Sequence, residues 1–398
     1  MKRHWYGWCV LVILLIWAEM LPAAPLKIGE IDPLTGRFAK QGREIHQGIA
    51  VAVAEVNEAG GIKGQLITLL TRDDQSRPDV AISMAEDLCA NQKIVGLTGG
   101  YVDALVGPIS EVASKYGVPY VASASLQKEL VQRGNPYFFR VATLSGFVAP
   151  LCDFFAKELK PQRLAILHAS TPGSTELAMD LEQCLKRRHL PVSMVEKFRP
   201  GTPDFTPLIG KLMNMKVEII FSGGFSHDHM LMVRQLKENG FTPKAYVGPF
   251  GIAYESFIEE MGPEAEFLFT TCAWNPGIYQ KGTAARSAEF RKRFRRMFGR
   301  EPNTTNMHGY TSTMALLAAL HKVLARGLPA SGPHVRQALA KLDILLPMER
   351  LAFDSRGDPR FYRHVIVQVQ HGKLVVVYPP AKATGTAIYP MPPWNRRK

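Results

Sequence analysis

The stretch NEAGGIKGQLITLLTRDD, Asn57–Asp74, decides between two very different kinds of protein. Its glycines and Lys63 could cradle a phosphate, or they could only turn the chain. A phosphate loop needs glycines after a strand and before a helix, where free backbone N–H groups face the anion. Here the order is reversed, because Gly60 and Gly61 follow a helical pattern at 44–59 and precede an apolar run. With no Ser or Thr after the Lys-Gly pair, we predict a helix C-terminal cap and a turn.

Outward from this turn, apolar runs alternate with helical patterns in two rounds. The first round predicts strands at 26–32, 66–74, 94–100, 119–125 and 138–142, with helices at 44–59, 79–92 and 103–116. The second predicts strands at 164–170, 191–198, 217–224, 244–251 and 266–273, with helices at 147–159, 174–189, 205–215, 227–239 and 254–260. Three further helices are predicted, at 284–298, 307–326 and 333–341. They are followed by a predicted hairpin at 361–378 and an extended proline-rich tail. The predicted class is α/β, with two doubly wound, mostly parallel sheets.

The N-terminus has the layout of a secretory signal peptide. Lys2 and Arg3 precede an apolar core at 8–18, and small residues follow at Ala23 and Ala24. The apolar core is short for a membrane span, so we predict cleavage after Ala23 and an exported protein without stable membrane insertion.

Charge and cysteine content agree with export. The formal net charge of the 398 residues is +13, and it falls by one to +12 without Lys2, Arg3 and Glu19. Such a basic balance is often found in nucleic-acid binders, but export argues against that partner. The remaining cysteines, Cys89, Cys152, Cys184 and Cys272, have no metal-ligand spacing, and Cys152–Cys184 on neighbouring predicted helices is the candidate disulfide.

One long segment carries a family resemblance. Residues 29–88 resemble the leucine/isoleucine/valine-binding protein family, on the sequence GEIDPLTGRFAKQGREIHQGIAVAVAEVNEAGGIKGQLITLLTRDDQSRPDVAISMAEDL. The match extends over about 26–378 through four shorter segments, SEVASKYGVPYVASAS, RGNPYFFRV, IFSGG and VGPFG. The resemblance implies a type I periplasmic-binding fold, two lobes joined by three crossovers near 143, 274 and 347. The first lobe would comprise 24–143 and 275–346, and the second 144–274 and 347–398.

The ligand site is expected at the carboxyl ends of the strands. In open α/β sheets, ligands bind there, where helix N-termini offer backbone N–H donors. The resemblance implies a ligand carboxylate held by hydroxyls and amides of the first lobe, with a tyrosine and an acidic residue of the second lobe holding the ammonium. The candidate ligand-binding residues are Gln41, Tyr101, Val102, Asp103, Ala124, Ser125, Leu126, Gly173, Phe225 and Phe250.

This chain departs from the implied pattern where the ammonium would bind. The tyrosine position is Phe225 and the acidic position is Phe250, while Asp103 could supply a carboxylate from the other lobe. A buried ammonium without a partner costs several kcal/mol, so we expect an organic acid, an aromatic carboxylate or a small amide to bind better than leucine. The alternative for both phenylalanines is ordinary core packing.

Other chemistry finds weaker support. The sequence GFSHD at 224–228 begins like a nucleophile elbow but has Asp228 in place of the last glycine, so Ser226 is interpreted as a helix N-cap. His227 and His229 lack converging ligands and are expected to face solvent, and no metal site is predicted. No dinucleotide fingerprint is present, and no cofactor is expected.

The sequence therefore predicts a monomeric periplasmic protein that captures a small molecule and delivers it to ABC permease subunits, without catalysis. Two alternatives stay open, a receptor that presents its ligand to a membrane sensor and a secreted α/β hydrolase that uses Ser226.

Overall fold

A computed structural model describes residues 24–397, so the predicted signal peptide lies outside the described residues. The first sheet is wholly parallel, in the order β2-β1-β3-β4-β5. Its strands and first helices are β1 (Leu26–Asp32), α2 (Ala39–Glu58), β2 (Ile67–Asp73), α3 (Pro78–Glu86), η1 (Asp87–Asn91), β3 (Leu97–Tyr101), α4 (Asp103–Lys115), β4 (Tyr120–Ala124), α5 (Lys128–Gln132) and β5 (Phe138–Arg140).

The second sheet has the order β14-β13-β10-β9-β8-β6-β7, parallel from β6 to β10 and antiparallel at β13 and β14. Its elements are α6 (Ser145–Phe154), η2 (Phe155–Leu159), β6 (Leu164–Ala169), α7 (Pro172–Arg187), β7 (Val192–Phe198), α8 (Thr206–Asn214), β8 (Ile219–Gly223), α9 (Ser226–Glu238), β9 (Ala245–Gly248), α10 (Glu255–Met261), η3 (Gly262–Ala265), β10 (Phe269–Cys272), β13 (Val365–Gln370) and β14 (Lys373–Tyr378). The predicted α/β class with two doubly wound sheets is confirmed.

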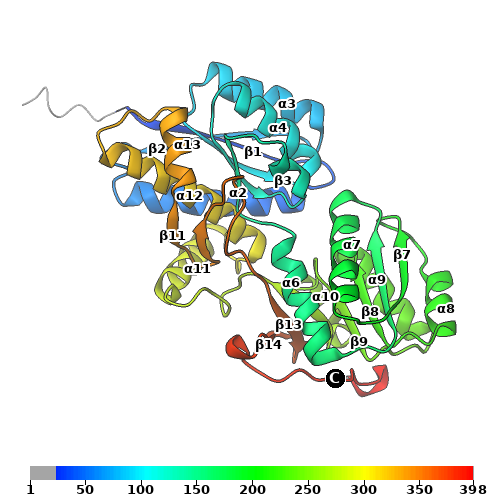
Figure 1. Cartoon of the computed structure of the whole chain (residues 1–398). Coiled ribbons are helices and arrows are strands. Elements are labelled where there is room, and N and C mark those ends of the chain that lie inside the picture. The colour runs from blue at the N-terminus through cyan, green and yellow to red at the C-terminus, as the bar shows by residue number, and fades with distance from the viewer. Residues whose placement is uncertain (1–23, 398) are drawn as a thin grey trace, which may run out of the picture.

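Three crossings connect these two lobes (Figure 1). The chain leaves the first sheet after β5 and returns after β10 through α11 (Ala284–Phe298), α12 (Thr304–Ala325) and α13 (Gly332–Ala340). The helix α12 packs on α2, β3 and β4, so these late residues complete the first lobe. A small pair, β11 (Asp343–Leu345) and β12 (Arg350–Ala352), precedes the last crossing to β13. The lobe boundaries near 143, 274 and 347 stay predictions.

The glycine-rich stretch is a structural turn, as predicted. The helix α2 ends there with Gly60 and Gly61 at φ +89° and +76°, a left-handed conformation that glycine adopts at little cost. The N–H of Gly61 donates to Val56 O at 2.9 Å, and the side chain of Asn57 exchanges two hydrogen bonds with the backbone of Ile67 at the start of β2. The turn therefore fixes how β2 enters the sheet.

The predicted disulfide is confirmed, because Cys152 on α6 and Cys184 on α7 are joined, while Cys89 and Cys272 are free and buried. The proline-rich tail is less extended than expected and is held against the second lobe. It has short turns at η4 (Pro380–Lys382) and η5 (Trp394–Arg396), and Trp394 Nε1 donates to Phe241 O at 2.9 Å. Between residues 24 and 397 we find no helix that is long and apolar enough to span a membrane.

Candidate functional site

The carboxyl ends of β3 and β4 bring six of the predicted residues together. Tyr101 is paired with Ala124 in the sheet, and the N–H of Val102 donates to Ala124 O at 3.1 Å. Val102 has φ +61°, which is a strained conformation for a β-branched residue. Its position directly before α4 turns Asp103, the first residue of that helix, back toward the end of β4.

Asp103 is the centre of this arrangement. Its Oδ1 accepts hydrogen bonds from Ser125 Oγ at 2.9 Å, from the N–H of Leu126 at 2.8 Å and from the N–H of Gln127 at 3.0 Å. The loop after β4 thus presents a hydroxyl and two consecutive amides to one carboxylate oxygen. Such concave groups of N–H donors are anion-binding sites in general, and here the anion is supplied by the chain itself.

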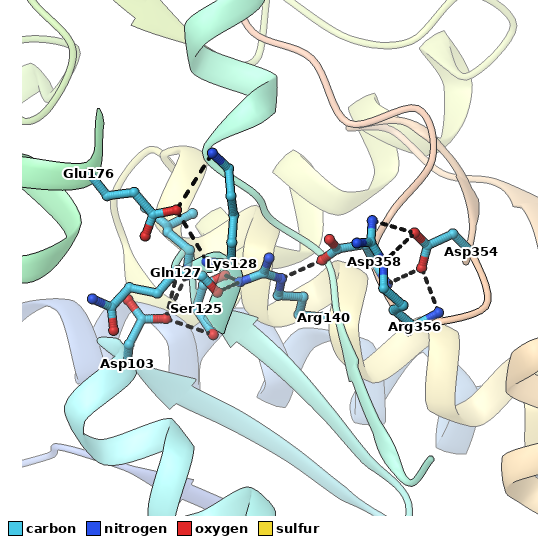
Figure 2. A network of polar contacts seen from close by, with 10 residues as sticks. Asp103, Ser125, Gln127, Lys128, Arg140, Glu176, Asp354, Arg356 and Asp358 are labelled. Carbon is cyan, nitrogen blue, oxygen red and sulfur yellow. Dashed lines mark hydrogen bonds and ion pairs between the residues drawn. The ribbon is translucent and has the colours of Figure 1, made fainter. Parts of the chain in front are cut away.

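The carbonyl side of the same loop is held by Arg140, at the end of β5. The guanidinium is fully buried, and its Nη1 donates to Gln127 O at 2.6 Å and to Ser125 O at 3.4 Å. Its Nε donates to Asp358 Oδ1 at 2.6 Å, in the turn that precedes the last crossing between the lobes. Figure 2 shows Arg140 between this turn and the loop, with Asp103 on the loop's other side. The sequence analysis missed Arg140, because its partners lie far away along the chain.

The second lobe contributes an aromatic wall. The rings of Phe225 and Phe250, each half-buried, are stacked with centroids 6.2 Å apart, and Phe147 contacts Phe250 edge to face at 5.4 Å. Phe250 also packs against the main hydrophobic core. The two predicted residues are therefore in contact, and core packing leaves a portion of each ring exposed.

On the first lobe, Phe38 packs edge to face on Tyr101 at 5.7 Å. Burial raises the pKa of the Tyr101 hydroxyl, and the charges of Glu44 and Asp103 act in the same direction. Burial also raises the pKa of Tyr254, which follows β9 in the second lobe, to about 12, with Glu44 again contributing. The charge of Glu44 thus acts on one tyrosine of each lobe. Phe38, Glu44 and Tyr254 are additions to the predicted set.

Glu44 is buried on α2, and its Oε2 has no hydrogen-bond partner within residues 24–397. Burial raises the pKa of this carboxyl despite nearby Asn303 and Arg300. An unpartnered buried carboxyl oxygen is costly unless a ligand or water donates to it. Glu44 was not among the predicted site residues, because nothing in the helical pattern at 44–59 marks a single carboxyl as part of a site.

Two predicted residues lie apart from the others. Gln41 is half-buried in the first turn of α2, and Gly173 is in the first turn of α7 with no atom near the place of a Cβ. Within residues 24–397, no hydrogen bond connects either residue to the other candidates. Next to Gly173, a cavity of about 810 Å³ is lined by Gln127 from the first lobe and by residues that include Ser170, Thr171, Thr175 and Glu176 from the second.

The lobes touch beside this cavity. Lys128 Nζ lies 2.5 Å from Asp180 Oδ2 on α7, and the backbone N–H of Lys128 donates to Glu176 Oε1 at 3.3 Å. Elsewhere along the cleft, Lys40 Nζ donates to Ser256 Oγ at 3.2 Å. Because each pair joins residues of different lobes, the structure shows the lobes drawn together.

Two neighbouring carboxyls at the end of β2 support the loop that carries Phe38. Asp73 accepts hydrogen bonds from Thr35 Oγ1 at 2.6 Å and from the N–H of Leu34 at 2.9 Å. Burial opposes its ionisation, but these donors outweigh burial and lower its pKa. Asp74 is fully buried and accepts from the N–H of Ser76 at 2.8 Å, and burial raises its pKa to about 6.

These opposite shifts give a pH prediction with a matched control. The folded protein holds a proton on Asp74 between the ordinary pKa of 3.8 and about 6, so this group lowers stability as the pH rises through that window. We expect Asp74→Asn to gain up to about 3 kcal/mol relative to wild type between pH 4 and pH 7, measured by urea unfolding. Asp73→Asn should lose stability relative to wild type as the pH rises only below the ordinary pKa of 3.8, because the pKa of Asp73 is lowered, and its difference from wild type should stay constant between pH 4 and pH 7. An equal pH dependence in the two variants would contradict the assignment.

Two expectations about the segment 224–229 are wrong. Ser226 is not the N-cap of α9, because its Oγ donates to Gly251 O at 3.2 Å, and Asp228 instead accepts from the N–H of Phe225 at 3.0 Å. His227 is exposed as expected, but His229 is fully buried and hydrogen-bonded to Tyr246 at 2.8 Å, with its pKa lowered by burial to about 4. His229 lies six residues after the end of β8, on the side of α9 that contacts Tyr246 of β9, and this contact buries it despite its polarity. Among residues 24–397 no group of His, Cys, Asp or Glu is arranged to hold a metal ion.

Known proteins are similar to the chain over almost its whole length. A family model for periplasmic binding proteins matches residues 25–373. Leu/Ile/Val-binding protein homolog 7 of Brucella abortus is 26% identical over 414 aligned residues, which cover 96% of this chain and 98% of that protein.

Solved structures share the fold. The branched-chain amino acid transporter substrate binding protein LivJ of Streptococcus pneumoniae, in complex with isoleucine, has a TM-score of 0.76 at 21% identity, with 88% of this chain and 97% of that chain covered. A solute binding protein of an ABC transporter from Rhodopseudomonas palustris, in complex with 3,4-dihydroxy benzoic acid, has a TM-score of 0.76 at 20% identity. The alignment covers 92% of this chain and 98% of that chain. At these identities the likeness concerns the fold and leaves the ligand open.

Proposed function

Because the chain belongs to the periplasmic binding protein family, we propose that it is an exported receptor that captures a small molecule between its lobes and delivers it to an ABC importer of the branched-chain amino acid type. The observation that carries the proposal is the meeting of both lobes at the strand ends, where the loop after β4 contacts α7 through Lys128. Ligand contacts to both lobes favour the closed form, which is capture without chemistry.

The ligand proposed is an organic acid, an aromatic acid or an amide rather than leucine. In this proposal the stacked Phe225 and Phe250 line the cleft, and no acidic side chain stands at position 250 to pair with an ammonium. The fold itself is compatible with both aliphatic and aromatic ligands, since one similar protein was solved with isoleucine and another with a dihydroxy benzoic acid.

A thermal-shift screen tests the proposal. The mature chain would be heated with amino acids, aliphatic acids, aromatic acids and their amides, each in large excess. A compound that binds only the folded state adds about 2.7 kcal/mol at a concentration of 100 times its Kd, which raises the melting temperature by several degrees. At least one compound of the panel should do so, and a panel without any shift would refute capture of small molecules of this kind.

The contact between Lys128 and α7 should stabilise the closed form. We expect Lys128→Ala to weaken the best ligand of the screen about two- to fivefold, which is the range for a partly exposed ion pair. Lys115→Ala is the control, because its partner Glu86 belongs to the same lobe. Calorimetry should show a weaker Kd for the first variant only, and equal effects of both would mean that the Lys128 contact has no role in closure.

The two alternatives are tested by other means. A receptor for a membrane sensor would bind the same ligands, and neighbouring genes for a kinase rather than permeases would favour it. A hydrolase would need Ser226 next to a base, but Ser226 Oγ donates to a backbone carbonyl and His229 is bonded to Tyr246. Esterase activity that is lost in Ser226→Ala would revive that alternative.

A further inference from the structure

We propose that Asp103 selects the ligand: its carboxylate occupies the anion-binding nest after β4, so the cleft rejects a carboxylate group and takes a head group that donates N–H bonds, an amide or a protonated amine. This inference rests on the proposed function and narrows its ligand class: it keeps the amides, sets the organic and aromatic acids aside, and admits a protonated amine, for which Asp103 supplies the carboxylate that position 250 lacks.

The nest is defined by three donors that converge on one oxygen. Asp103 Oδ1 lies between 2.8 and 3.0 Å from each of three donors, Ser125 Oγ, Leu126 N and Gln127 N. Consecutive amides with a hydroxyl beside them, at the carboxyl edge of a parallel sheet, are the arrangement that would bind a ligand carboxylate or phosphate. Hydrogen bonds to an ionised acceptor are the strong ones, so an external anion would have to displace a well-bound internal one.

The backbone is built to keep Asp103 in place. Val102 holds its strained conformation directly before Asp103. On the far side of the nest, Arg140 binds the carbonyls of Ser125 and Gln127 and so fixes the direction in which the amides point. Strain of this kind persists where the surrounding structure requires it, as it does at binding sites.

The nest faces the place where the lobes meet. Gln127, which donates to Asp103, also lines the cavity of about 810 Å³ together with Glu176 of the other lobe. The charge of Asp103 is felt at Glu176 and at Tyr101, each of which has its pKa raised by burial first and by neighbouring carboxylates in addition. Asp103 is therefore at the inter-lobe surface.

The charges around this surface do not favour a second anion. The charges of Asp103 and Glu44 act on Tyr101, and Glu176, on which the charge of Asp103 also acts, lines the cavity. The two cations that lie on or contact the loop after β4 are already paired, since Lys128 contacts Asp180 and Arg140 contacts Asp358. A ligand carboxylate would meet repulsion and occupied donors, whereas a ligand N–H group would find carboxylate acceptors, such as Glu176 in the lining of the cavity.

Matched triplets of compounds test the inference. Benzoate, benzamide and benzylamine share a ring and differ in head group, and phenylacetate with its amide and amine gives a second triplet. Calorimetry and thermal shift would be run on the mature wild-type chain and on Asp103→Ala, Asp103→Asn and Asp79→Asn. Asp79→Asn is the control, because it removes one negative charge from the first turn of α3, where Asp79 contacts only Arg77.

In wild type and in Asp79→Asn, the amide or amine of a triplet should bind at least about tenfold more tightly than its carboxylate. In Asp103→Ala, the carboxylate should gain about 10- to 100-fold, which is the range for hydrogen bonds to a charged group. Asp103→Asn should give a smaller gain, because its Oδ1 still fills the nest while the repulsion is gone.

Two failures are distinguishable. In the first, compounds bind, but wild type prefers the carboxylate, or both variants of Asp103 weaken the binding of all three members of a triplet equally. Asp103 then only holds the loop, so the inference is wrong, while the proposed capture of small molecules stands. If no member of any triplet binds to any variant and the broader screen is also silent, the proposed function is overturned and the inference falls with it.

Discussion

Replacing Arg140 with methionine is expected to lower the free energy of unfolding by about 3–5 kcal/mol, the cost of removing one partner of a buried ion pair. The guanidinium is fully buried and bonds Asp358 at 2.6 Å and Gln127 O at 2.6 Å. Methionine fills much of the volume but leaves both acceptors without donors. Because the loop after β4 would lose its anchor, ligand affinity should fall as well.

Urea unfolding at neutral pH measures the first effect, and calorimetry with the best compound of the screen measures the second. Arg133→Met is the control, since Arg133 is exposed and its partners Glu111 and Glu129 lie in the first lobe. That control should change stability by less than about 1 kcal/mol. Similar losses in the two variants would show that Arg140 is no more important than a surface arginine.

L-Leucine is expected to bind roughly 10³-fold more weakly than the best compound of the screen, since several kcal/mol of unfavourable free energy are involved. Its ammonium finds Phe250 where an acidic residue would be needed, and Phe250 is packed between Phe225 and Phe147. Its carboxylate finds the amides of Leu126 and Gln127 already bonded to Asp103. The carboxylate therefore meets donors that are already occupied, and the ammonium has no carboxylate partner at position 250.

Isothermal calorimetry with the mature chain decides this point, with the best compound of the screen titrated in parallel to show that the protein is active. A leucine affinity equal to that of the best compound would refute the account of Phe250 and Asp103 together. The unfolding midpoint should be recorded before and after the leucine titration. An unchanged midpoint shows that the protein stayed folded, so loss of folded protein is not the cause of a titration without heat.

Much of the fold was predictable from local pattern. The turn at Gly60 and Gly61 was recognisable because a left-handed cap needs glycine and its order relative to helix and strand excludes a phosphate loop. Buried parallel strands such as Leu164–Ala169 are continuous apolar runs, and they were placed to within a few residues. The start of α2 at Ala39 was missed, because its first turn carries the polar residues Lys40 and Gln41, which break the apolar stripe.

The site was only partly predictable. The loops after β3 and β4 follow from a general rule for parallel sheets, so Tyr101 and Ser125 were found. The bond from Asp103 to the loop and the bond from Arg140 to Asp358 join residues that are distant in sequence, and no local pattern encodes such partners. Ser226 and His229 were misjudged for the same reason, because the sheet and the loop after β9 supplied their partners.

Small-angle X-ray scattering with and without the best compound of the screen tests the central claim, that two lobes close on a guest, most directly. The bound form should reproduce the scattering of the closed arrangement in which Lys128 contacts Asp180, and the free form should have a larger radius of gyration. Curves that are identical with and without a compound that calorimetry shows to be bound would contradict capture by closure.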